Sequence, residues 1–212
     1  MKIFCIGFNK TGTSSLHELF VHNGLKSKHN IRWPHYSHIT AGKLYFTLYD
    51  AYSDGERSNF VRLHKWFPDA FFIFNDRDEQ KWIRSRLHHY FNHINDEEPT
   101  VKNFFIKKQY GFLVPEMKIC PEKAIDYWVT NYRLYKELSL NYFADEKRFL
   151  HLHVTEDIHW QDKLELFFKS NDIKISKTDG STSFNKSPSK IVMNPHVEEY
   201  MSYYIKTWVS KN

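Results

Sequence analysis

The chain has 212 residues, of which 41% are hydrophobic and 17% aromatic, so it is long enough to bury a sizeable core in one ordinary domain. Charged residues make up 26% and only seven Gly and seven Pro occur, a composition that excludes disordered and fibrous proteins. Thirty basic and twenty-five acidic residues leave a net charge of +5, but they are interspersed without a basic block, which indicates an anionic ligand and gives no support to a nucleic-acid partner.

The N-terminal segment is predicted to form a strand, a turn-rich loop and a helix. Residues 3–6 are a continuous apolar run that ends at Gly7, which is typical of a strand buried on both faces of a parallel sheet. Helical spacing begins at Thr13, and Gly24 supplies the stop signal. The apolar face of this helix is formed by Leu16, Leu19 and Phe20.

The same order of strand and helix recurs twice further along the chain. After a further predicted strand at residues 46–53, the apolar run 71–74 leads through residues 75–78 into a helix. Residues 149–154 are the third such strand. The second helix carries Trp82, Ile83, Leu87 and Tyr90 at helical spacing, and the third carries Trp160, Leu164, Phe167 and Phe168.

A long amphipathic helix is predicted to begin at Pro121 and to pack against the sheet. Its apolar face is formed by Ile125, Trp128, Tyr132 and Tyr135, which recur every three or four residues. Residues 171–195 are polar and are predicted to form a loop, and residues 196–210 a last helix. Strands alternating with helices, with no repeat or linker between them, predict a single α/β domain over residues 1–212.

The sequence gives no sign of a membrane span, a disulfide framework or a metal site. No apolar run approaches the roughly 20 residues that cross a bilayer, and the apolar N-terminal stretch is too short for a signal peptide. Cys5 and Cys120 lie far apart and lack the paired spacing of a zinc site. Histidines such as His151 and His153 come without flanking Cys or carboxylate ligands in a known pattern. We therefore expect a cytoplasmic protein without a metal.

The loop between the first strand and the first helix has the context of a phosphate-binding loop. Gly7 and Gly12 keep the G-x-x-x-x-G spacing of a Walker A loop, but Thr13 stands where that motif requires Lys, and the lysine is at position 10. A P-loop kinase also needs a carboxylate for Mg²⁺ at another strand end, which Asp76 or Asp78 could supply. An ATP-dependent kinase acting on a nucleotide or sugar is therefore an alternative interpretation of this loop.

A loop of the form K-[ST]-G-T-[ST] directly after the first strand resembles the 5′-phosphosulfate loop of the sulfotransferase family. The resemblance implies a three-layer α/β sandwich with a central parallel sheet, a P-loop NTPase-like fold. It also implies that the donor's 5′-phosphosulfate is bound by Lys10, Thr11, Gly12, Thr13, Ser14 and Ser15.

The second part of the resemblance lies after the strand at residues 71–74. In sulfotransferases an Arg ends that strand and a Ser eight residues later helps it to bind the 3′-phosphate of the donor, a spacing that Arg77 and Ser85 keep. Residues 75–85 are also similar to the R-D-x-x-x-W-x-x-S run of the bacterial-type branch. The family closes a basic segment near the C-terminus over the 3′-phosphate, and Lys186 is the local candidate, although its surroundings depart from the R-K-G pattern of the cytosolic branch.

The resemblance implies transfer of a sulfuryl group from 3′-phosphoadenosine 5′-phosphosulfate (PAPS) to a hydroxyl or amine of a glycan or small molecule. Because the sulfuryl group carries less charge than a phosphoryl group, one lysine and backbone donors can stabilise the transition state without a metal. The resemblance gives this role to Lys10. The acceptor is expected to depend on a helical segment at about residues 91–146, which matches no family pattern.

The acceptor must lose a proton to a nearby base. The cytosolic branch of the family has a His some 22 residues before the strand-end Arg, and Asp54 lies 23 residues before Arg77. Asp54 is the first candidate for the base, and His29, where the bacterial-type branch often has a His, is the second. If the chain has lost the base, it would be a non-catalytic nucleotide-binding scaffold.

Overall fold

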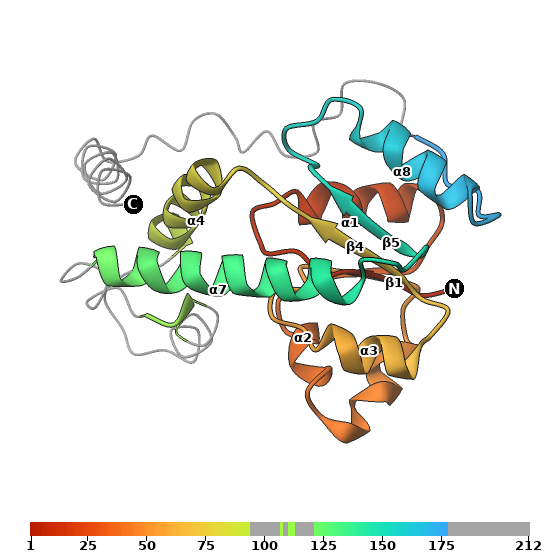
Figure 1. Ribbon diagram of the computed structural model, residues 1–212, viewed down its shortest axis with the longest axis horizontal. Coiled ribbons are helices and arrows are strands. Elements are labelled where there is room, and N and C mark those ends of the chain that lie inside the picture. Colours follow the sequence, from red (N-terminus) through yellow and green to blue (C-terminus); the bar gives the residue numbers. More distant parts are fainter. Residues whose placement is uncertain (94–106, 108–109, 113–120, 178–212) are drawn as a thin grey trace. The chain divides into compact units, whose positions relative to one another are not determined.

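The computed structural model describes residues 1–93, 107, 110–112 and 121–177 and divides the chain into two compact units (Figure 1). One unit consists of Met1–Arg77 and Tyr135–Ser187, and the other of Asp78–Leu134 and Pro188–Asn212. A single domain over residues 1–212 stays a prediction, and the polar segment after residue 177 and the last predicted helix lie outside the described residues.

The first unit is built on a five-stranded parallel sheet in the order β2-β3-β1-β4-β5. In β1 at the centre, Ile3 pairs with Ala51 on one side and with Phe71 on the other. The carboxyl ends of the parallel strands meet at one edge, where open α/β sheets bind their ligands. The strands are β1 (Ile3–Cys5), β2 (Ser27–His29), β3 (Ala51–Ser53), β4 (Phe71–Asn75) and β5 (Phe149–Leu152).

Helices cover both faces of this sheet and form two separate hydrophobic cores (Figure 1). Successive strand residues point to opposite faces, so Cys5 belongs to one core and Phe4 to the other. The core on the side of Cys5 is completed by α1 (Thr13–His22) and α8 (Trp160–Lys169), and the core on the side of Phe4 by α2 (Trp33–Tyr36), the 3₁₀ helix η1 (Thr40–Thr47) and α3 (Phe60–Trp66). The predicted three-layer α/β fold is confirmed.

Helix α1 ends where the sequence predicts, and Gly24 is the reason. Gly24 has a φ of 75°, and its N–H donates to the carbonyl of Val21 at 2.9 Å. The next N–H, of Leu25, donates to the carbonyl of Phe20 at 3.0 Å. These two bonds are the Schellman arrangement, which satisfies the last carbonyls of a helix.

The predicted strand at residues 46–53 is wrong over most of its length. Only Ala51–Ser53 pairs in the sheet, and Thr40–Thr47 forms η1. Phe46 is fully buried against Trp33 and Tyr52, so an apolar residue that indicated a strand instead anchors a short helix on the core. Strand β2 and helices α2 and α3 were not predicted.

The second unit contains α4 (Glu79–His93) and the first part of α7 (Pro121–Tyr142). Trp82 stacks on Tyr132 with ring centroids 4.4 Å apart, and the Arg133 guanidinium donates two hydrogen bonds of 2.7 Å to the Glu79 carboxylate. Of the predicted apolar face of α7, only Tyr135 belongs to the first unit, where it contacts Phe8 and Phe60. Packing of the helix against the sheet is therefore confirmed only at its C-terminal part.

Candidate functional site: the loop after β1 and its neighbours

The last residue of β4 holds the loop after β1 at two points. The Gly7 N–H donates to the Asn75 side-chain oxygen at 3.2 Å, and the Asn75 side-chain amide donates to the Thr11 hydroxyl at 2.5 Å. A Cβ at Gly7 would lie 2.1 Å from the Asn75 carbonyl oxygen, so only glycine fits. Because Thr11 is buried and also donates to the Phe8 carbonyl, its hydroxyl is committed to the loop, and only its backbone N–H can serve an anion.

Gly12 turns the chain from the loop into α1. It is the N-cap of the helix with a φ of 92°, and a Cβ at this position would lie 2.5 Å from Val154 Cγ1. The Gly12 carbonyl accepts the first helical bond, from Leu16 at 3.2 Å. The first-turn N–H groups of α1, at the positive end of the helix dipole, therefore begin at the ligand-binding edge of the sheet and suit an anion.

Two cationic side chains from distant parts of the sequence meet at this loop. Lys10 has a left-handed backbone with a φ of 67°, and its carbonyl oxygen accepts a hydrogen bond of 2.9 Å from Arg77 Nη1. Burial lowers the pKa of the Lys10 ammonium below its usual value; the Asp54 carboxylate raises this pKa and the Arg77 guanidinium lowers it again. Both predicted donor motifs thus contribute a cation to one place.

The two candidate bases lie on either side of Thr13. The Thr13 hydroxyl donates to Asp54 Oδ1 at 3.4 Å and lies 3.2 Å from His29 Nε2, and the two candidates approach each other to 4.0 Å. Asp54 follows β3 with a φ of 76° and is only 6% exposed, so it is not a solvated loop side chain. His29 is the last residue of β2.

His29 is held as a neutral imidazole at pH 7. Burial is the largest cause, and with the charges of His17 and Lys10 it lowers the pKa of His29 to about 4. The His17 ring stacks on the His29 ring at 5.6 Å and is itself fixed by a 2.8 Å hydrogen bond between its Nδ1 and the Ser27 hydroxyl. A neutral imidazole has a nitrogen lone pair and can accept a proton.

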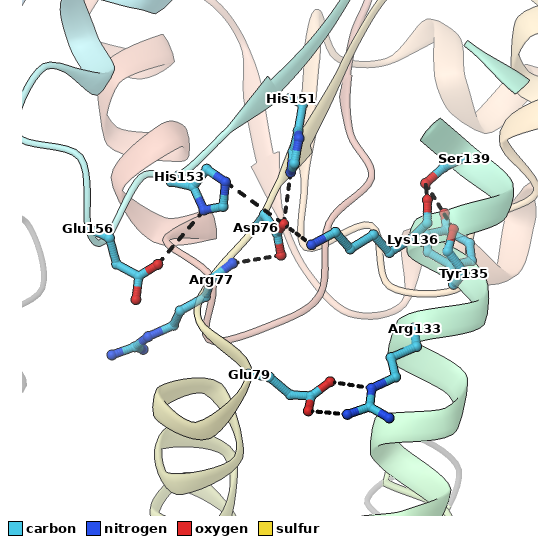
Figure 2. Close-up of polar contacts among 10 residues, drawn as sticks. All are labelled: Asp76, Arg77, Glu79, Arg133, Tyr135, Lys136, Ser139, His151, His153 and Glu156. Carbon is cyan, nitrogen blue, oxygen red and sulfur yellow. Dashed lines mark hydrogen bonds and ion pairs between the residues drawn. The ribbon is translucent and has the colours of Figure 1, made fainter. Parts of the chain in front are cut away.

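The two carboxylates that a kinase would use for Mg²⁺ have other contacts. Asp76 is fully buried, and its Oδ2 lies 2.5 Å from Lys136 Nζ and 2.8 Å from His151 Nε2 (Figure 2). Asp78 accepts a hydrogen bond of 3.0 Å from the Lys81 N–H and so caps the start of α4. Nitrogen neighbours and a capping role do not make the oxygen cage that Mg²⁺ prefers.

The structure describes some of the remaining residues predicted to bind the donor and not others. Ser14 and Ser15 are half-buried in the first turn of α1. Ser85 lies on α4 in the second unit, so its partnership with Arg77 at the donor site stays a prediction. Lys186 lies outside the described residues. We did not predict from the sequence that Asn75 holds the loop through Gly7 and Thr11. The signal for it in the sequence is a polar residue at the end of an apolar strand, just before Arg77.

A five-stranded parallel sheet flanked by helices, with a glycine-bounded loop between β1 and α1 and an arginine after β4, is an α/β fold consistent with the P-loop-like fold of sulfotransferases. A family model described as a sulfotransferase domain matches residues 2–160. The match spans most of the chain and includes the loop, both candidate bases and Arg77, and the chain belongs to the sulfotransferase family. A search of curated proteins finds no match. Within the described ranges, no helix combines the length and apolar character needed to cross a membrane.

Proposed function

We propose that this sulfotransferase takes its sulfuryl group from PAPS and transfers it to a hydroxyl or amine of a glycan or small molecule in the cytoplasm. The observation that carries the proposal is the hydrogen bond from Arg77 to the Lys10 carbonyl. It joins the loop suited to a 5′-phosphosulfate and the arginine suited to a 3′-phosphate, because a guanidinium can donate two parallel bonds to a phosphate dianion.

In the proposed reaction the acceptor oxygen or nitrogen attacks sulfur, and the bond between sulfur and the 5′-phosphate oxygen breaks. Adenosine 3′,5′-bisphosphate leaves with the electron pair of that bond. Negative charge grows on the oxygen that leaves sulfur, and the Lys10 ammonium with the first N–H groups of α1 stabilises it there. The contribution of Lys10 is largest in the transition state, because that charge is small in the bound donor.

The acceptor proton passes to Asp54, with His29 as the alternative. Asp54 is the stronger candidate because it is buried beside the loop and acts electrostatically on the Lys10 ammonium. The Thr13 hydroxyl contacts both side chains and can hold either one in place. A base must reach the proton that it removes. Asp54 and His29 both contact Thr13, which directly follows Gly12 in the donor loop.

Calorimetry with the donor product tests the proposal. We expect tight binding of adenosine 3′,5′-bisphosphate in the presence of a chelator and weak binding of ATP with Mg²⁺. Arg77→Ala should weaken bisphosphate binding by about thirtyfold, because a charge-assisted bidentate contact contributes on the order of 2 kcal/mol, and Ser85→Ala should weaken it less.

The matched control is Arg148→Ala, since Arg148 is a partly exposed arginine just before β5 that pairs with Asp69 at 3.6 Å. Its bisphosphate affinity should equal that of the wild type. Tighter binding of ATP with Mg²⁺ would support the kinase alternative, and equal losses in Arg77→Ala and Arg148→Ala would remove Arg77 from the donor site. Bisphosphate binding without turnover on a panel of sugar, phenol and amine acceptors would indicate a non-catalytic scaffold.

A further inference from the structure

A buried carboxylate at the end of β4 faces an unusual number of nitrogen atoms. Asp76 Oδ2 lies 2.5 Å from Lys136 Nζ, 2.8 Å from His151 Nε2 and 4.0 Å from His153 Nε2 (Figure 2). Asp76 Oδ1 accepts the Arg77 N–H at 2.8 Å. A carboxylate oxygen has about two lone pairs and therefore accepts about two hydrogen bonds. Oδ2 has three nitrogen neighbours, which is more than it needs as hydrogen-bond donors.

The sheet itself brings these groups together. Strand β5 runs beside β4, with Phe74 opposite His151, and the Asp76 N–H continues this pairing by donating to the Leu152 carbonyl at 2.8 Å. His151 and His153 are two residues apart, so they project from the same side of an extended chain. Both imidazoles therefore reach the same oxygen of the buried carboxylate as a consequence of the strand register.

Two imidazoles and one carboxylate are a ligand set that suits zinc and related transition metals. One ligand atom from each of Asp76, His151 and His153 can be chosen so that all three lie within 4.8 Å of one another. Ligands about 2.0 Å from a tetrahedral zinc lie about 3.3 Å apart. The separations of 2.8 and 4.0 Å from Asp76 lie on either side of this value, so small ring rotations are sufficient.

Two neighbouring side chains bear on how such a site would work. Glu156 lies 3.8 Å from His153 Nδ1, the ring nitrogen on the far side from Asp76, and a carboxylate in that position orients a metal-binding imidazole. Lys136 places its ammonium on Asp76 Oδ2, where a metal ion would bind. The Lys136 side chain is 35% exposed, so it can turn outward into water when a metal ion arrives.

We propose that Asp76, His151 and His153 bind one divalent transition-metal ion of the zinc type, and that Lys136 competes with this ion as an internal cation. Three protein ligands leave a fourth position for water or a substrate atom. The site replaces the expectation that the protein has no metal. It is separate from the sulfuryl-transfer step proposed above, which needs none, so either proposal can fail without the other.

Zinc titration of the full-length protein against a chromophoric chelator tests the site, with Co²⁺ absorption as a second readout. We expect one ion per chain, weaker binding by roughly a hundredfold in His153→Ala, and weaker binding by about tenfold in Glu156→Gln. Lys136→Met should tighten binding by about tenfold or more, because removal of a competing ammonium leaves the Asp76 carboxylate available to the ion.

The control is His159→Ala, because His159 pairs with Asp162 at 3.1 Å in an exposed histidine–carboxylate contact outside the site. Its zinc affinity should equal that of the wild type. Equal affinity in wild type and His153→Ala, or weaker binding in Lys136→Met, would overturn the proposal. These two variants change partly exposed side chains, so the test stands even if His151→Ala fails to fold.

Discussion

Replacing Gly12 by alanine tests whether the donor loop is shaped by its contact with the chain after β5. Gly12 has a φ of 92°, and an added Cβ would lie 2.5 Å from Val154 Cγ1 and 2.6 Å from Val154 Cβ. Gly24 is the matched control, since its φ is 75° and an added Cβ meets nothing within 4 Å. Both alanine variants force a side chain into the left-handed region, but only Gly12→Ala also overpacks the interior.

The left-handed backbone costs about 1–2 kcal/mol for a residue with a Cβ, and overpacking a well-filled interior costs about 1–3 kcal/mol more. Gly24→Ala should therefore lower the free energy of unfolding by about 1–2 kcal/mol and Gly12→Ala by about 2–5 kcal/mol. For a chain of this size, each kcal/mol lowers the melting temperature by about 2–4 °C.

Urea denaturation gives these free energies, and the double variant Gly12→Ala with Val154→Ala gives the coupling. We expect the second substitution to recover part of the overpacking cost of about 1–3 kcal/mol relative to the sum of the single effects, because it removes Val154 Cγ1 and leaves only Cβ in the way. Gly12→Ala should also lose bisphosphate affinity, whereas Gly24→Ala should keep it. Equal unfolding free energies for the two single variants, or no coupling between Gly12 and Val154, would refute the reasoning.

The remaining predictions concern the catalytic groups. Lys10→Ala should lower turnover by about a hundredfold or more while donor affinity changes far less; a loss in affinity alone would make Lys10 a binding residue. Asp54→Asn should lower turnover comparably and His29→Ala only modestly, and the reverse order in kinetics with radiolabelled donor would exchange their roles. The lowered pKa of His29, about 4 against an ordinary 6.5, means that the unfolded chain binds the additional proton first. Stability should therefore fall as pH drops from about 6.5 to 4, and less steeply in His29→Ala; identical urea midpoints against pH would contradict this.

The sequence predicts those strands and helices that a single apolar segment is enough to indicate. Strands β1, β4 and β5 coincide with apolar runs of the sequence. The helices after these strands have apolar residues at a clear spacing of three and four positions. Strand β2 has the sequence Ser-Lys-His and is partly exposed at the edge of the sheet, so its pairing depends on β3 and not on its own composition. The predicted strand at residues 46–53 fails at its start for the opposite reason, because Phe46 is buried on the core at the end of a 3₁₀ helix without strand pairing.

The candidate site could be predicted only where a motif is contiguous. The Lys10 loop and the spacing of Arg77 were visible in the sequence, and so were Asp54 and His29 as separate candidates. Their meeting around Thr13 depends on the order of β2, β3 and β1, which no local pattern encodes. His151 of β5 and His153 just after it likewise lie beside a carboxylate only because β5 pairs with β4, and so spacing along the chain indicated no metal site.

The left-handed backbone at Lys10 and Asp54 has a consequence for how this protein can be improved. Both residues have φ values that favour glycine, 67° and 76°, and yet each carries a charged side chain. Glycine at either position would relieve about 1–2 kcal/mol of strain and lose about 0.5–1 kcal/mol through the greater freedom of the unfolded chain. If Lys10 and Asp54 have the proposed catalytic roles, a thermostability screen that ignores turnover would accept glycine at both positions and enrich well-folded, inactive proteins. Directed evolution of such a protein would then have to select for sulfuryl transfer in every round.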